Sequence, residues 1–378
     1  MSELQENTAI TDEEIPAAMA QVVADPLFES VAAYVYPEMS LDKVKAMLLG
    51  IRSVRDLQCN LMRRNLDRLL ERSQTTFDYS LTPLLRHDQR YLFISNHRDI
   101  ILDAMLLQCA FIDEHFETSR IIYGTNLLSV PMFGVISRAN KMVGIARGGT
   151  PREFYKCLSS MSQFIREAIE SDTDSVWIAQ GNGRTKDGND ITDPAIIKMF
   201  AMSDRKLLSQ AVADLHPVPI SISYELEPCD AQKVIELTKR RIFKHYEKGD
   251  DEDFESVLTG ITSNKRHVHI TVCDPLTDAE LLACHDDASA VATLIDSKIY
   301  SGYKLYPYNY VAYDLRYGGG RFAAHYTDDA MLSFIDHQQQ VMAQVMKNAD
   351  IANEEGRAIA EQIFLDIYAN PVKNIEKL

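Results

Sequence analysis

The chain has 378 residues, 46% of them hydrophobic, and a formal net charge of −16. This length predicts one large domain with appendages, or two domains. The acidity argues against nucleic acid as the main partner and against long-range attraction to an anionic membrane. No apolar run is long enough for a transmembrane helix, and the acidic start is unlike a signal peptide. The six cysteines form no CxxC pair, which is typical of reduced thiols in a cytoplasmic protein.

The first part of the chain is predicted to be helical after an unstructured start. Residues 1–25 are acidic and polar, so we expect them to be poorly ordered. A helical region is expected over residues 26–84. Its clearest part is 41–73, where apolar residues recur every three or four positions between charged ones.

From residue 85 onward the pattern changes to short β-prone runs that alternate with helical stretches. The runs are YLFIS (91–95), RIIYG (120–124), KMVGIA (141–146), SVWIAQ (175–180), PVPISISY (217–224) and HVHITVC (267–273). This alternation predicts an α/β fold with a mainly parallel central sheet flanked by helices, over residues 85–325. Residues 326–378 return to a helical pattern and are expected to form a C-terminal helical extension.

Chemistry is expected where the strands end, because open α/β sheets bind ligands at the carboxyl ends of their strands. Four places follow predicted strands and carry polar side chains: His97, Arg147, the loop GNGRTKDGND (181–190) and Tyr224-Glu225. These places are the candidates for a functional site.

His97 lies in the stretch SNHRDIILD together with two aspartates, Asp99 and Asp103. Residues four apart share a helix face, so either carboxylate is able to reach the histidine. A carboxylate on one ring nitrogen fixes the tautomer and leaves the other nitrogen as a general base. The alternative is a histidine held by the backbone, with the aspartates capping a helix.

Arg147 stands before GGTPREF, in which Thr150, Pro151 and Glu153 predict a capped helix start. Helix starts with nearby glycines attract phosphate and other anions. A structural ion pair is the alternative for this arginine.

The loop at 181–190 combines glycines with Arg184 and Lys186, which fits phosphate binding, although it is neither a Walker A loop nor an EF-hand. No metal site is expected, because His267 and His269 have no recognisable third ligand.

Together these blocks resemble the glycerophospholipid acyltransferase (PlsC-like lysophospholipid acyltransferase) superfamily, over roughly residues 85–275. That family carries N-H-x4-D, G-x-I/F-x-x-R, E-G-T-R and V-P-V/I blocks. The matching stretches are Asn96-His97 with Asp103, Gly144-Ile145-Ala146-Arg147, Asn182-Gly183-Arg184, and Pro217-Val218-Pro219-Ile220. The His97-Arg98 pair is similar to the glycerol-phosphate acyltransferase branch, and the longer phrasing resembles a bacterial subgroup.

The resemblance implies an acyltransferase domain at 85–325 that moves a fatty acyl group from acyl-CoA or acyl carrier protein to a lipid hydroxyl. It implies His97 as general base, Asp103 or Asp99 as its partner, and no metal or other cofactor. The residues that it places at the substrate are Arg98, Arg147, Asn182, Gly183, Arg184 and Lys186. It also implies a peripheral enzyme at the cytoplasmic face of the membrane, with lipid contacts from residues 127–136, the N-terminal helical part, or both.

Two departures from the family pattern leave alternatives open. Five residues separate His97 from Asp103 where the family has four, so Asp99 is a second candidate partner, with Asp103 favoured. Asn182 stands where the family carries glutamate. A non-catalytic lipid- or acyl-binding protein that kept the fold is therefore the alternative function, and a metal-dependent hydrolase is a third, less favoured one.

Overall fold

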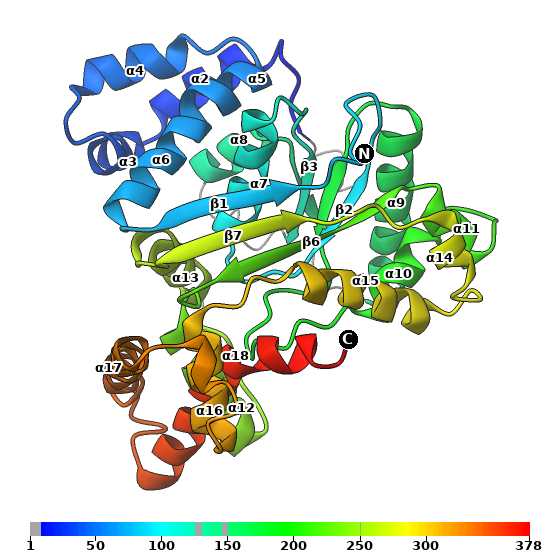
Figure 1. The fold of residues 1–378 in the computed structure, drawn as a ribbon. Coiled ribbons are helices and arrows are strands. Elements are labelled where there is room, and N and C mark those ends of the chain that lie inside the picture. The colour runs from blue at the N-terminus through cyan, green and yellow to red at the C-terminus, as the bar shows by residue number, and fades with distance from the viewer. Residues whose placement is uncertain (1–8, 125–130, 146–149, 250) are drawn as a thin grey trace.

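The structure is a computed structural model that describes residues 9–124, 131–145, 150–249 and 251–378 (Figure 1). Across these ranges seven strands form one sheet in the order β1-β7-β6-β2-β5-β3-β4. The strands are β1 Thr76–Leu81, β2 Leu92–Ser95, β3 Arg120–Gly124, β4 Met142–Ile145, β5 Val176–Ala179, β6 Pro217–Tyr224 and β7 His267–Val272. Every pairing is parallel except β6 with β7.

The sheet confirms the predicted α/β class and adds one strand. All six predicted runs contain a strand, and those at 120–124 and 217–224 have the predicted bounds. The additional strand, β1, lies at the sheet edge and pairs in register with β7, Thr76 opposite His267. Its residues alternate between exposed and half-buried, so it lacks the apolar run that marks the buried strands.

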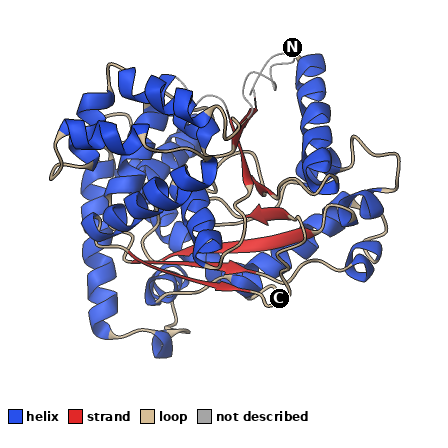
Figure 2. Ribbon diagram, turned by 90° about the horizontal axis from the view of Figure 1, so that it is seen from above, coloured by secondary structure: helices blue, strands red, loops and turns tan. Residues whose placement is uncertain are grey.

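Helices cover both faces of the sheet (Figure 2). One face packs on α9 Pro151–Glu170, α10 Pro194–Phe200, α11 Leu208–Ala213, α14 Asp278–Leu282 and α15 Ala288–Gly302. The other face packs on α6 Arg63–Arg72, α7 Leu102–Asp113 and α13 Glu252–Thr262. Helix α9 starts as predicted: Thr150 caps it, Pro151 is its first residue, and Glu153 completes the capping box.

An N-terminal helical layer packs beside the sheet. It consists of α2 Ile15–Ala24, α3 Phe28–Val35, α4 Leu41–Leu49, α5 Val54–Leu57 and the π-helical turn η1 Gln58–Met62, together with α8 Pro131–Ala139. The expectation that residues 1–25 are poorly ordered is wrong for 15–24, because Ile15, Met19 and Val22 form one buried helix face. Helix α8 turns Met132 and Val135 into the same core, so these two side chains of the expected lipid-contact segment are covered by protein.

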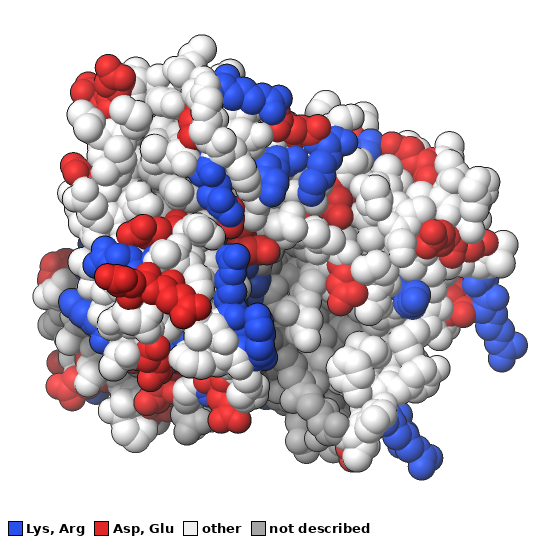
Figure 3. Space-filling view, turned by 90° about the horizontal axis from the view of Figure 1, so that it is seen from below, with Lys and Arg blue, Asp and Glu red and all other residues white. Residues whose placement is uncertain are grey.

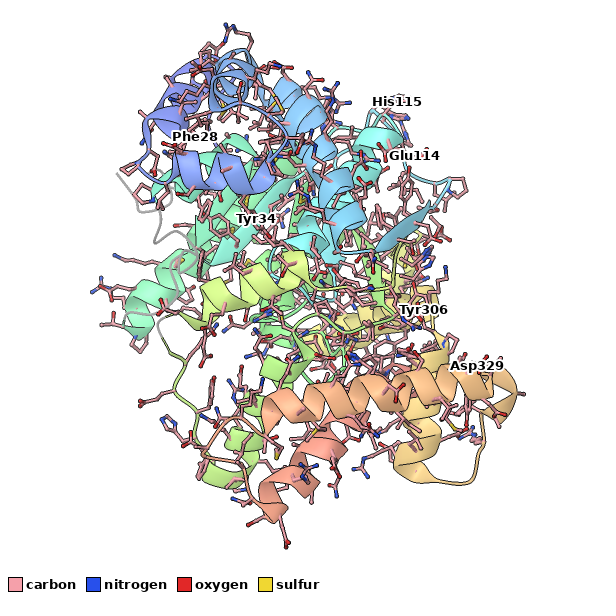
Figure 4. The ribbon with its side chains drawn as sticks, turned by 90° about the vertical axis from the view of Figure 1, so that its left-hand side faces the viewer. Phe28, Tyr34, Glu114, His115, Tyr306 and Asp329 are labelled. Carbon is pink, nitrogen blue, oxygen red and sulfur yellow. The ribbon has the colours of Figure 1, made fainter. Side chains whose placement is uncertain are left out.

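A second helical layer forms the C-terminal end. Its elements are α12 Asp230–Phe243, α16 Pro307–Tyr317, the 3-10 turn η3 Ala323–His325, α17 Asp328–Val345 and α18 Glu354–Ile375. Figure 4 shows the two layers at opposite ends of the molecule, one marked by Phe28 and Tyr34 and the other by Asp329 on α17. Within the described residues, no helix combines the length and the apolar character needed to cross a bilayer.

Candidate active site

His97 lies two residues beyond the end of β2, which is paired on one side with β5 and on the other with β6. The imidazole Nδ1 is 2.8 Å from Oδ2 of Asp103, in the first turn of α7. The His97 side chain keeps 16% of its surface exposed, whereas the Asp103 side chain has none. The arrangement is therefore a solvent-reachable histidine on a fully buried carboxylate.

Asp103 is held on all sides by hydrogen-bond donors. Its Oδ2 also accepts the backbone N–H groups of Arg98 and Asp99 at 2.6 and 2.9 Å, and its Oδ1 accepts the hydroxyl of Tyr224 at 2.7 Å. Burial would raise the pKa of this carboxyl, but hydrogen bonds from His97, Tyr224 and the backbone outweigh burial and lower it. Asp103 thus remains an anion that is fixed in orientation beside the imidazole.

Asp99 has a different position and a different task. It lies before α7, which begins at Leu102, so the two aspartates do not share a helix face as expected. Its Oδ1 accepts the backbone N–H groups of Ile101 and Leu102 at 2.9 and 2.8 Å, as a cap does. Burial and the nearby Asp103 carboxylate raise the pKa of Asp99. The structure therefore pairs His97 with Asp103 and makes Asp99 a helix cap.

Asn96 ties the loop to the sheet. Its amide oxygen accepts the N–H of Ile222 at 2.8 Å, and its amide nitrogen donates to the Ile222 carbonyl at 2.9 Å and to Asp190 at 3.1 Å. The side chain has no exposed surface. The ring of Trp177, on β5, lies edge-on to the His97 imidazole with 5.9 Å between ring centroids. The histidine loop is thus fixed by both neighbouring strands.

Arg98 is not placed as a substrate contact. Its side chain is completely buried, and its guanidinium donates to Asp190 at 2.6 and 3.1 Å and to Glu227 at 2.9 Å. Arginine forms such planar, two-pronged pairs with carboxylates, and this pair leaves the guanidinium no solvent-facing donor. Instead of the expected contact with substrate, Arg98 binds the buried carboxylates of Asp190 and Glu227.

The loop at 181–190 brings basic side chains next to the histidine loop. The N–H of Thr185 donates to the His97 carbonyl at 2.7 Å. Gly183 has a φ of +94°, a conformation that favours glycine, and its neighbour Asn182 is exposed. Lys186 forms an ion pair with Glu236, and burial lowers the pKa of its ammonium group. The predicted Gly-rich turn thus lies against His97.

A polar cavity of about 170 Å³ opens between this loop and helices α12 and α13. Its basic lining residues are Arg184, Lys186, Lys233, Lys239 and Lys248. Two lining atoms, Nη1 of Arg184 and Oε1 of Gln232, are buried without a hydrogen-bond partner among the described residues. Figure 3, which views the molecule from below, shows Lys and Arg side chains along one side of a hollow. A ligand that offers an anionic oxygen would satisfy the arginine.

Two further predictions have different outcomes. Ala146-Arg147 lies outside the described residues, so the second family block is described only for Gly144 and Ile145 on β4. His267 and His269 both contact the carboxylate of Asp78, on the neighbouring strand β1. The strand period that puts both histidines on one face thus brings them to the same carboxylate.

Some residues of the site were missed from the sequence. Tyr224 was flagged only by its position after a strand, and Asp190 only as part of a glycine-rich loop. Glu227 and Lys233 carried no signal, because they follow β6 in a stretch that resembles an ordinary helix start. Their role depends on contacts with Arg98, more than 100 residues away in the chain.

Part of the chain is similar to a known protein family. Residues 73–223 match the sequence model of the family described as Acyltransferase. The chain is similar to the crystal structure of the 1-acyl-sn-glycerophosphate (LPA) acyltransferase, PlsC, from Thermotoga maritima. That likeness has 12% identity and a TM-score of 0.37 over 75% of this chain and 93% of that one. No curated protein matches the chain.

Proposed function

We propose, from the match of residues 73–223 to the Acyltransferase family model, the reaction that this chain catalyses. It transfers a fatty acyl group from the thioester of acyl-CoA or acyl carrier protein to a hydroxyl of a glycerol phosphate, lysophospholipid or related lyso-lipid. The observation that carries the proposal is the His97 Nδ1–Asp103 contact at 2.8 Å, with the carboxylate buried and the imidazole reachable.

The chemistry follows from that contact. With Asp103 accepting the Nδ1 proton, the lone pair of His97 lies on Nε2, which is the general base. Nε2 removes the proton of the acceptor hydroxyl while the oxygen attacks the thioester carbonyl. The tetrahedral intermediate collapses by releasing the thiolate, and the imidazolium returns its proton to that sulfur. Asp103 stays ionised throughout and stabilises the transient positive charge.

The acceptor's anionic group is proposed to bind on the basic side of the site. Arg184, with its unpartnered Nη1 in the cavity, is the main contact, and Lys186 lies beside it. Gly183 allows a close approach of the backbone to that group. Arg147, assigned through the family resemblance, is proposed as a second anion contact. The acyl donor is a co-substrate, and no resident cofactor or metal enters the proposal.

A peripheral association with the cytoplasmic face of the membrane is part of the proposal. Exposed apolar side chains on the N-terminal layer support it: Leu27, Tyr34 and Leu49 have 46%, 53% and 42% of their surface exposed. Because the net charge is −16, apolar contact rather than charge attraction would drive this association.

The test is a thiol-release assay with purified protein, acyl-CoA or acyl carrier protein, and a panel of phosphorylated acceptors. His97→Ala is expected to lower the rate by about 10²–10⁴-fold, as loss of a general base does. His245→Ala, whose side chain is 73% exposed, is the matched control and should keep the wild-type rate. If His97→Ala leaves the rate of thiol release unchanged, His97 is not the general base.

A second candidate function is favoured by one residue. Asn182 is exposed and stands where the resembling family carries a glutamate, which suits a lipid- or acyl-binding protein without catalysis. The assay separates the two functions: binding of acylated ligand without thiol release from any donor would favour the second. Asn182→Glu would then be the variant expected to gain activity.

A further inference from the structure

Arg98, the residue that follows His97, belongs to a cluster of four buried charges. Arg98 and Lys233 carry the positive charges, and Asp190 and Glu227 carry the negative ones. Their exposed fractions are 0%, 2%, 2% and 6% in that order. Each carboxylate is shared or doubly engaged: Glu227 accepts from Arg98 at 2.9 Å and from Lys233 at 2.6 Å. We call these residues the buried quartet; its charges sum to zero.

The buried quartet forms hydrogen bonds with the backbone of the His97 loop as well as with its side chains. The ammonium of Lys233 donates to the Arg98 carbonyl at 2.9 Å. The Arg98 N–H, at the other end of the same residue, donates to Asp103 at 2.6 Å. A shift of Lys233 or Glu227 would therefore move Arg98, and with it the peptide that separates His97 from the rest of the loop.

The quartet is in turn anchored to the C-terminal layer. The N–H of Glu227 donates to the hydroxyl of Tyr368, on α18, at 3.1 Å. That hydroxyl donates to Asp230 at 2.9 Å, and Tyr368 is almost fully buried. Helix α18 also contacts the loop at 181–190, where Asn370 donates to the Asp187 carbonyl at 2.7 Å. One helix thus supports both segments that hold Arg98.

These anchors lie outside the family match, which ends at residue 223. We propose that Glu227, Lys233 and Tyr368 are positioning residues that hold the His97–Asp103 pair in its reactive geometry. The C-terminal helical layer is then a working part of the active site of this protein. This inference rests on the proposed function, since it concerns how the proposed base is oriented.

Physical reasons favour a positioning role over simple stabilisation. Burying four charges is costly unless every one is paired, so such networks contribute little net stability compared with apolar packing. They do fix one geometry, because any displacement leaves a charge unpaired in a low-dielectric interior. Catalysis by a base is sensitive to such displacement, and a misplacement of about 1 Å can lower a rate by about 10²-fold.

The test compares Glu227→Gln and Tyr368→Phe with Tyr36→Phe. Tyr36 is equally suited to the substitution: it is buried in the N-terminal layer, and its hydroxyl donates to Asn65, on α6, at 2.6 Å. We expect Glu227→Gln and Tyr368→Phe to lower kcat by about tenfold to a hundredfold with KM nearly unchanged. Tyr36→Phe should keep the wild-type kcat in protein that is folded by circular dichroism.

A second readout does not depend on turnover. The imidazole of His97 is followed by ¹⁵N NMR at one fixed pH, with its resonances assigned from their loss in His97→Ala. Both quartet variants should change the Nδ1 chemical shift, because Asp103 moves relative to the ring, and Tyr36→Phe should not. A chemical shift and kcat equal to wild type in both quartet variants would overturn the positioning role. Inactive wild-type protein, or full activity in His97→Ala, would instead overturn the proposed function, while the Nδ1 chemical shift still decides the positioning.

Discussion

Two aspartates of the histidine loop show how the same side chain takes opposite roles at different positions. Asp103 and Asp99 are both buried, yet the pKa of Asp103 is lowered and that of Asp99 is raised. The difference arises from the donors: Asp103 accepts from His97, Tyr224 and two backbone N–H groups, whereas Asp99 has an Oδ2 without a partner among the described residues. The surroundings therefore stabilise the charged carboxylate at Asp103 and destabilise it at Asp99.

The matched pair Asp103→Asn and Asp99→Asn tests this assignment. Both changes keep the shape, but only the first removes the negative charge beside the imidazole. Asp103→Asn is expected to lower acyl transfer by about 10²–10⁴-fold, since the imidazolium loses its counter-charge. Asp99→Asn should keep most of the activity, because its amide oxygen still caps α7. Steady-state thiol release measures both, and equal losses would contradict the pairing of His97 with Asp103.

Asp296, on α15, offers a pH prediction. Burial raises its pKa to about 6, although Thr192 donates to it through its N–H and hydroxyl. Because the folded-state pKa exceeds the unfolded value of about 3.9, the stabilisation from this group is full below pH 4 and is lost as pH rises through 6. Relative to Asp296→Asn, the wild-type free energy of unfolding should fall by up to about 3 kcal/mol between pH 4 and 7. Urea unfolding across that range measures the difference, and parallel curves would contradict it.

At the scale of elements, the contact between the loop at 181–190 and α18 is close enough to test with glycines. A Cβ on Gly188 would lie 2.0 Å from the Ile367 carbonyl oxygen, whereas one on Gly183 would meet nothing within 4 Å. Both glycines have positive φ, +74° and +94°. The two alanine variants therefore share the backbone strain and differ only in the collision with the helix.

Gly188→Ala is expected to lower the free energy of unfolding by at least about 2 kcal/mol more than Gly183→Ala does, because the collision adds to a shared strain. Chemical denaturation gives the two values. Equal losses would mean that the loop and α18 separate at little cost, which the contact distance argues against.

The elements also show where sequence patterns suffice. Strands that are buried along nearly their whole length stand out as β-prone runs, which is why RIIYG and PVPISISY gave the correct bounds. The strand at 76–81 alternates polar and apolar residues at an edge and resembles the surrounding polar sequence. The helix at 15–24 was missed because the acidic residues before it masked the apolar stripe of Ile15, Met19 and Val22.

The site was predictable only as far as its residues lie close in the sequence. His97 and Asp103 are only six residues apart in the chain, so their pairing was among the alternatives drawn from the sequence. Arg98 was predicted to face the substrate, and its burial depends on Asp190 and Glu227, which reach it from 92 and 129 residues away. No local pattern encodes such a contact in a single sequence.

At the scale of the whole molecule, the sheet carries two satellite cores. The N-terminal one includes Ile15 and the C-terminal one includes Ile367, both essentially unexposed. The second core borders the loop at 181–190, because Gly188 lies directly against Ile367. Similar losses of core packing should therefore have dissimilar effects on catalysis.

Ile15→Ala and Ile367→Ala make that comparison, because both replace a buried isoleucine with alanine. Each is expected to cost about 2–5 kcal/mol of unfolding free energy through the cavity it leaves. Ile367→Ala should also lower kcat, while Ile15→Ala should leave the kcat of folded protein unchanged. Calorimetry and thiol release at a temperature well below both melting points provide the measurements. A lower kcat in Ile15→Ala would show that the N-terminal layer also shapes the site.

The pairing of β1 with β7 has a consequence for how the chain is made. Thr76, in the first strand to leave the ribosome, finds its β7 neighbours about 190 residues later. At roughly 5–20 residues per second, β1 waits on the order of 10–40 seconds for that partner. During synthesis β1 is thus without its partner strand, and the seven-stranded sheet is completed only after Val272 has been added to the chain.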